Sequence, residues 1–194
     1  MDLDRAIGLG GIPETGLIEF YGPQERSLKN LTFQILKAAL KQSEAVAFID
    51  TTHAAQAAQA AKNKSDAIPI IPASNLTNRV QAGESLIRKG VNLLAVGPLP
   101  DANKKMNTAL SQTISRLYGL ATEYQAAVLL LNPKKVKLHT DIEDLALHPI
   151  ALYADVRIEI KPRTEVDDTA IPYVEAVIVK NRCAEPFGKA QFPS

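Results

Sequence analysis

The residues of clearest chemical interest lie in the first strand–turn–helix of the chain. Residues 17–21 predict a strand, Gly22 and Pro23 predict a turn, and the spacing of apolar residues predicts a helix over residues 28–41. A strand, a glycine-containing turn and a helix form the frame of a phosphate-binding loop. In such a loop, backbone amides and the helix N-terminus hold phosphate groups. The first question is therefore whether this segment binds a nucleotide.

The segment departs from the phosphate-loop pattern at the positions that carry the chemistry. The pattern G-x-x-x-x-G-K-[ST], counted from Gly22, requires glycine, lysine and a hydroxyl residue where the chain has Ser27, Leu28 and Lys29. One step along a helix rotates a side chain by about 100°, so Lys29 does not replace a lysine at the preceding position. Two interpretations stay open. Gly22, Ser27, Leu28 and Lys29 retain weak phosphate binding through backbone amides, or the turn only connects the strand to the helix.

Two groups of basic residues could contact an anion. Lys134, Lys135 and Lys137 form a short basic run in the irregular segment 132–148, which we expect to be an exposed loop. These lysines either contact DNA phosphates or form a solvated face, and no aromatic residue lies among them for base stacking. Lys180 and Arg182 are alternate residues at the end of a predicted strand, so their side chains point to the same side.

The remaining reactive residues do not predict a metal site. His53 and His148 have no histidine or cysteine partner at ligand spacing, so we expect ordinary surface or capping histidines. Cys183 is the single cysteine, which excludes an intramolecular disulfide and a cysteine-rich metal site. Because free cysteine is usually buried, we expect Cys183 in the core.

Composition limits the class of protein. The chain has 194 residues, of which 46% are hydrophobic and 22% charged, values typical of a globular domain. A formal net charge of +1 excludes a strongly basic field over the whole surface, although a local basic patch is compatible with it. Apolar runs stay well below the ~20 residues that a membrane helix needs, and the first residues lack a signal-peptide pattern. We expect a soluble, cytoplasmic, single domain with no membrane partner.

The elements that must position these residues alternate between strand and helix. Short aliphatic runs predict strands over 17–21, 45–50, 67–71, 93–96 and 127–131. Helical spacing predicts helices over 28–41, 53–62, 76–89 and 106–123. Residues 156–160 and 173–179 alternate like antiparallel strands, joined by a polar loop over 162–169. This order predicts an α/β fold whose mostly parallel sheet has an antiparallel extension.

Several segments, taken in order, resemble the ATPase core of the bacterial recombinase RecA over nearly the whole length. They are Gly10-Gly11-Ile12-Pro13, Ile18-Glu19-Phe20-Tyr21-Gly22-Pro23, Leu31-Thr32-Phe33-Gln34, Ala47-Phe48-Ile49-Asp50, Tyr153-Ala154 with Val156-Arg157, and Lys180-Asn181-Arg182 with Gln191-Phe192. The resemblance implies a RecA-like P-loop NTPase core: a mostly parallel central sheet flanked by helices, with an antiparallel C-terminal extension. It also implies one core domain over residues 1–194, without that family's N-terminal linking segment or C-terminal domain.

The resemblance also shows where the family's working residues fall, and all of them are replaced. In chain order, the phosphate lysine falls on Leu28, the magnesium-binding threonine on Lys29, the catalytic glutamate on Thr52, the adenine contacts on Gln56 and Gln59, the Walker B acid on Gly97 and the γ-phosphate sensor on Pro133. Phosphoryl transfer needs charge neutralisation by lysine and Mg²⁺ and a positioned water. We therefore expect no ATPase activity and no ATP or Mg²⁺ cofactor.

The implied function is binding rather than catalysis. In the resembled family, two basic residues at the positions of Lys180 and Arg182 reach the ATP of a neighbouring protomer; the alternative is a solvated pair at a strand edge. The two DNA-binding loops look reduced, to residues 97–105 and 133–148, so single-stranded DNA would bind weakly.

Our first hypothesis is a non-catalytic accessory or regulator of DNA repair or recombination with a protein partner, such as a RecA-type recombinase. The alternatives are a RecA-fold inhibitor or scaffold without a DNA role, and a weak nucleotide-dependent DNA-binding protein.

Overall fold

The computed structural model describes residues 2–50, 68–99, 106–133, 149–162, 173–185 and 188–193. Their strands form one eight-stranded sheet in the order β3-β2-β4-β5-β1-β6-β7-β8. Six strands run parallel: β1 (Gly16–Tyr21), β2 (Val46–Asp50), β3 (Ile70–Pro72), β4 (Leu93–Gly97), β5 (Ala127–Asn132) and β6 (Val156–Pro162). The last two, β7 (Tyr173–Asn181) and β8 (Lys189–Pro193), extend the sheet in antiparallel pairing.

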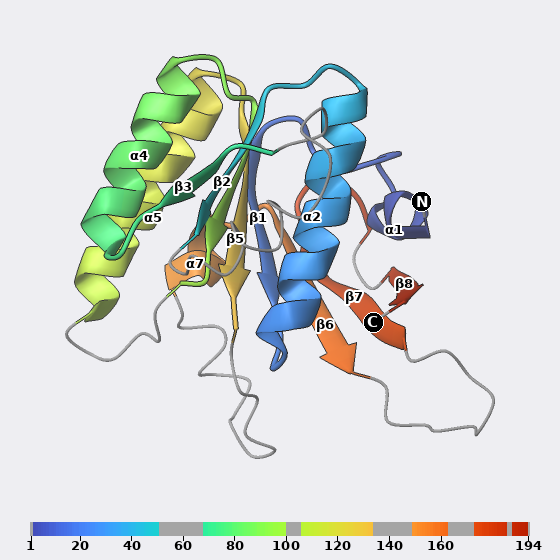
Figure 1. Ribbon diagram of the computed structural model, residues 1–194. Coiled ribbons are helices and arrows are strands. Elements are labelled where there is room, and N and C mark those ends of the chain that lie inside the picture. Colours follow the sequence, from blue (N-terminus) through green and yellow to red (C-terminus); the bar gives the residue numbers. More distant parts are fainter. Residues whose placement is uncertain are drawn as a thin grey trace.

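Helices cover both faces of the sheet (Figure 1). Helices α1 (Asp2–Ile7) and α2 (Glu25–Lys41) lie on one face; α4 (Leu76–Arg88), α5 (Met106–Glu123) and the short α7 (Pro149–Tyr153) lie on the other. Each face has its own apolar core, one around Phe20, Leu28 and Phe48 and the other around Ile49, Leu94 and Leu117. The central strands β1, β2, β4 and β5 are buried along their whole length, which is why their sequences are nearly continuous apolar runs.

The predicted α/β architecture is confirmed, with its parallel sheet and antiparallel extension. Helix α2 begins at Glu25 rather than at residue 28, because its first turn is polar and shows no apolar spacing. Strand β3 starts later than predicted, at Ile70. The helices α1 and α7 were not predicted because six and five residues are too few to show helical spacing. Strand β8 was not predicted because its sequence lacks the unbroken apolar run of the other short strands.

One predicted helix, over residues 53–62, lies outside the described residues. Within the described ranges, no helix combines the length and apolar character that a membrane span requires.

Candidate functional site

The turn between β1 and α2 occupies the place of the expected phosphate loop, and it is short. Gln24 caps the helix in an extended conformation, and the N–H groups of Ser27 and Leu28 donate to its carbonyl oxygen at 3.1 and 3.2 Å. These amides therefore already form the first turn of α2. The Leu28 side chain is fully buried in the apolar core. The geometry supports the interpretation of a connecting turn, because Ser27 and Leu28 hold no free amide for a phosphate.

Lys29 extends from the first turns of α2 to the end of β2. Its ammonium lies 3.2 Å from Asp50 Oδ1 and 3.3 Å from Oδ2, and 2.9 Å from Glu25 Oε1. Asp50 is completely buried, and the Lys29 side chain is only 16% exposed. A buried carboxylate requires a compensating charge, and here the chain itself supplies one. The ion pair gives Asp50 a structural role.

A second cation lies beside this pair. Arg79, in the first turn of α4, is 6% exposed, and its guanidinium donates to the carbonyl oxygens of Ala73, after β3, and Pro98, after β4. Burial lowers the pKa of Arg79, while the charge of Asp50 acts in the opposite direction. Lys29 and Arg79 thus place two positive charges at the carboxyl edge of the parallel strands, around one buried carboxylate.

Two further positions at this edge lack the side chains that phosphoryl transfer needs. A Cβ atom at Gly97 would overlap Cβ of Leu131 on the neighbouring strand, so only glycine fits at the end of β4. Pro133 follows β5 and has no hydrogen-bonding side chain. Its neighbour Asn132 is buried and donates to Glu19 Oε1 at 2.7 Å, within the sheet. This edge therefore offers no carboxylate at Gly97 and no amide at Pro133.

A buried polar cluster joins β1, β5 and β6. Glu19 is completely buried and accepts from Asn132 and, at 2.5 Å, from Nε of Arg157. The Arg157 guanidinium also lies over the ring of Tyr21, 5.1 Å from its centroid. Burial, together with the charge of Glu159, raises the pKa of Tyr21 well above its usual range. Because both oxygens of Glu19 are paired, this cluster positions β6 rather than offering an open acid.

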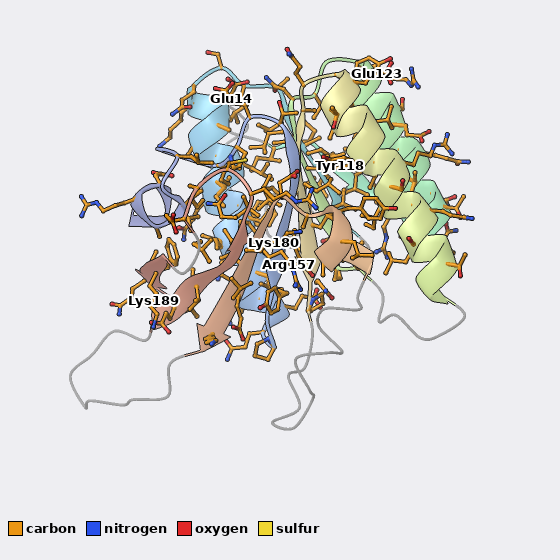
Figure 2. The ribbon with its side chains drawn as sticks, turned by 180° about the vertical axis from the view of Figure 1, so that it is seen from behind. Glu14, Tyr118, Glu123, Arg157, Lys180 and Lys189 are labelled. Atoms are coloured by element: carbon orange, nitrogen blue, oxygen red, sulfur yellow. The ribbon has the colours of Figure 1, made fainter. Side chains whose placement is uncertain are left out.

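Lys180 and Arg182 reach the same helix, as the alternation of the strand predicted. The Lys180 ammonium donates to the carbonyl oxygen of Ala151 at 2.8 Å, and Arg182 donates to that of Leu152 at 2.7 Å and to Asp155 Oδ1 at 3.2 Å. Figure 2 shows Lys180 beside Arg157 on the face of the sheet that carries α5 and α7. Burial, and then the nearby charges of Arg182 and Arg157, lower the pKa of Lys180.

These contacts stabilise α7 in one position. Cations are favourable at the C-terminal end of a helix, where carbonyl groups have no partner within the helix. The fixed helix presents Leu152, which is 61% exposed and is the most exposed of the large apolar side chains in the described residues. The Arg182 side chain, at 45% exposure, lies beside it. The sequence did not single out Leu152, because α7 itself was not predicted.

Several residues singled out from the sequence are not among those that the structure describes. Lys134, Lys135, Lys137, Thr52, His53, Gln56, Gln59 and His148 lie outside the described residues. Over the described ranges, no group of histidine, cysteine and acidic residues could hold a metal ion. The prediction that Cys183 is buried was wrong. It is exposed, just after β7, where the amides of Cys183 and Ala184 donate to Oδ1 of Asn181.

Comparison with known proteins relates this arrangement to one family. The family model of the RecA N-terminal domain matches residues 1–87. The chain is similar to the RecA protein of Leptospira biflexa, with 27% identity over 99% of this chain and 56% of that protein. It is similar to the RecA protein of Geobacter sulfurreducens, with 25% identity over 99% of this chain and 64% of that protein. The chain is similar to RecA proteins over nearly its whole length.

The resemblance inferred from the sequence is thereby confirmed, and a solved structure agrees with the fold. That structure, the ATPase domain of another protein, superposes with a TM-score of 0.69 over 99% of this chain and 85% of its own chain, at 15% identity. The chain spans 56–64% of the length of the two RecA proteins named above.

Proposed function

We propose that this protein is a non-catalytic accessory or regulator of DNA recombination that acts by docking on a RecA-type recombinase. The observation that carries the proposal is the ion pair of Lys29 with the buried Asp50. By resemblance, position 29 is that of the threonine that binds Mg²⁺. In this chain that position holds Lys29, whose ammonium is paired with Asp50. A magnesium ion would find no carboxylate at Gly97 and no hydroxyl at Lys29 to bind it. ATP hydrolysis needs those groups together.

The surface around α7 supports docking as the mode of action. Leu152 supplies an exposed apolar side chain at its centre, and Arg182 and Lys180 supply cations beside it. An apolar anchor with neighbouring cationic groups is a common composition for the centre of a protein interface. The N–H groups of Arg182 that are not bonded to Leu152 and Asp155 are available to an anion. By resemblance, that anion is the ATP at the exposed end of a recombinase filament.

The experiment measures assembly of a RecA-type recombinase on single-stranded DNA with increasing amounts of this protein. A protein that caps one filament end slows growth at substoichiometric amounts, whereas a competitor for DNA needs amounts comparable to the DNA. We expect the capping behaviour. We also expect Leu152→Ser and Arg182→Met each to reduce the effect by about tenfold, as the loss of one interface anchor or one charge-assisted hydrogen bond implies.

Matched controls separate docking from general damage. Leu9→Ser removes another exposed leucine, and Lys41→Met removes an exposed cation. Leu9 follows α1 and Lys41 ends α2, the two helices on the face of the sheet opposite α7. A thermal melt of each variant verifies folding. The proposal fails if the control variants and the α7 variants act alike, or if the protein leaves filament growth unchanged. No effect on filaments would favour a RecA-fold scaffold without a DNA role.

A further inference from the structure

Strand β8 forms one end of the sheet, and its pairing fixes which backbone groups face outward. In the register with β7, Gly188 opposes Ile178, and the N–H of Ile178 donates to the carbonyl oxygen of Gly188. Bonded pairs alternate along an antiparallel ladder, so Ala190 and Phe192 also bond to β7. The N–H and C=O groups of Lys189 and Gln191 therefore point away from the sheet. They have no backbone partner among the described residues.

A groove follows this edge. It has a volume of about 570 Å³ and is lined by Arg5 and Ala6 of α1, by Glu175 of β7 and by residues 188–191. Its lining includes four consecutive residues, 188–191, that lead into and form β8. Figure 1 shows α1 beside β8, and Figure 2 shows Lys189 at the border of the sheet.

Helix α1 closes the groove at one end. A Cβ atom at Gly188 would overlap the carbonyl oxygen of Ala6, so the helix backbone lies directly against the start of β8. Along β8 itself, successive side chains alternate between the core and the solvent, as in any strand with one buried face. Ala190 and Phe192 are buried in the core, while Lys189 and Gln191 are exposed. The edge is thus ordered and anchored, and only its outer hydrogen-bonding groups are unused.

The charges around the groove favour an acidic ligand. Arg5 is exposed and forms no ion pair with a described residue. Lys189 is 64% exposed, and its ammonium is 3.9 Å from Glu175 Oε1, at the outer limit of an ion pair. Two cations and one carboxylate leave one net positive charge, with the Arg5 cation uncompensated by described residues.

We propose that the outer edge of β8 binds an extended, acidic segment of a partner protein, which adds a strand to the sheet. The segment's main chain would bond to the N–H and C=O groups of Lys189 and Gln191. Alternate side chains of an added strand point to the two faces of the sheet. Acidic side chains on them would meet Lys189 on one face and Arg5 on the other. This site is separate from the surface around α7, so the proposal does not depend on the proposed function.

The experiment uses a short synthetic peptide of threonine with two adjacent glutamates, which place one carboxylate on each face of the added strand. The peptide is labelled with a fluorophore and compared with the same peptide carrying lysine in place of glutamate. Binding is measured by fluorescence anisotropy, and the site is located by amide shifts in NMR spectra. We expect saturable binding of the glutamate peptide, shifts at Lys189 and Gln191, and at least about tenfold weaker binding of the lysine peptide. Charge reversal by Arg5→Glu or Lys189→Glu should invert that preference.

Two variants at one position test the backbone contact. Gln191→Pro removes an outward N–H that β7 does not use, whereas Gln191→Ala removes only the side chain. We expect Gln191→Pro to weaken peptide binding by about tenfold and Gln191→Ala to leave it unchanged, with equal melting temperatures. Equal affinity of both peptides, equal effects of the two variants, or pairing of β8 with a second copy of the chain in place of the peptide would overturn the proposal.

Discussion

The ammonium of Lys29 and the carboxylate of Asp50 lie 3.2 Å apart, although 21 residues separate them in the chain. They come together because the first turns of α2 pass over the carboxyl end of β2. Asp50 has no exposed surface, so its charge depends on groups that the chain brings to it. Lys29 and Arg79 supply positive charges there, and both belong to the chain itself.

The first prediction concerns the stability that Lys29 provides. Replacing it by methionine removes a cation that contacts both oxygens of the buried Asp50, whereas the charge of Arg79 remains. Breaking a buried pair in this way costs about 3–5 kcal/mol. We expect Lys29→Met to lower the free energy of unfolding by about 3 kcal/mol, measured by urea denaturation.

Lys37→Met is the matched control, since Lys37 is an exposed lysine of the same helix. It should change the stability by less than about 0.5 kcal/mol. The double variant Lys29→Met/Asp50→Asn, which removes both charges, should recover part of the loss. Equal stabilities of the Lys29 and Lys37 variants would contradict the prediction.

The second prediction is that restoring the motif residues does not restore a nucleotide site. The variant Ser27→Gly/Leu28→Lys/Lys29→Thr has the required residue types, but α2 still begins at Glu25 and uses the amides of residues 27 and 28 in its own first turn. Leu28→Lys also places a charge in the apolar core. We expect neither this variant nor the parent protein to bind or hydrolyse MgATP in calorimetric titration and phosphate-release assays.

The single variant Lys29→Thr is the control for misfolding, because it keeps Leu28 in the core. If it also fails to bind MgATP, misfolding of the triple variant is not the reason. Its folding is verified by circular dichroism before titration. Saturable micromolar MgATP binding by any of the three proteins, or magnesium-dependent phosphate release that follows the protein through repurification, would refute the prediction.

The sequence predicted the parts of this fold that have strong local patterns. The strands β2, β4 and β5 are buried on both faces, and their unbroken apolar runs were sufficient to find them. The first turn of α2 was missed because Glu25, Arg26 and Ser27 show no apolar spacing, and a helix start without a side-chain cap has no local signal.

The site could be predicted only in part, for a different reason. The pattern located Lys29 and Asp50 separately, but their contact depends on where a helix passes over a strand end. The parallel order of β2 and β1 does bring Asp50 and the β1–α2 turn to one edge, which is the signal that could have paired them. Arg79 had no such signal, since its partners Ala73 and Pro98 are backbone groups after two different strands.

The third prediction concerns a buried hydroxyl. Thr32 Oγ1 lies in α2 with no exposed surface and no hydrogen-bond partner among the described residues. An unsatisfied buried hydroxyl destabilises the folded state, and valine has nearly the same shape. We expect Thr32→Val to raise the free energy of unfolding by about 1 kcal/mol in urea denaturation. Thr77→Val, at an exposed position of α4, is the control and should change it by less than about 0.5 kcal/mol. A destabilised Thr32→Val variant would show that the hydroxyl has a partner.

The fourth prediction concerns the pH dependence that Lys180 gives to stability. Burial, and then the charges of Arg182 and Arg157, lower its pKa from the ordinary value of 10.5. Between the lowered value and 10.5, the unfolded chain binds a proton that the folded chain does not. The contribution of Lys180 to stability therefore rises as the pH increases through this window, and it falls as the pH decreases toward the folded-state pKa.

Lys180→Met removes this titration, so we expect its free energy of unfolding to rise less steeply toward alkaline pH than that of the parent protein. Lys161→Met, at an exposed lysine of the neighbouring β6, is the control and should retain the parent slope. A phosphate anion bound at Lys180 would favour the charged form and raise its pKa, so docking on a filament end should abolish the slope difference. Parallel pH profiles of the parent and Lys180→Met proteins, in denaturation series across the alkaline range, would show that neither burial nor the charges of Arg182 and Arg157 lower the pKa of Lys180. The surface proposed for docking would then lose its electrostatic basis.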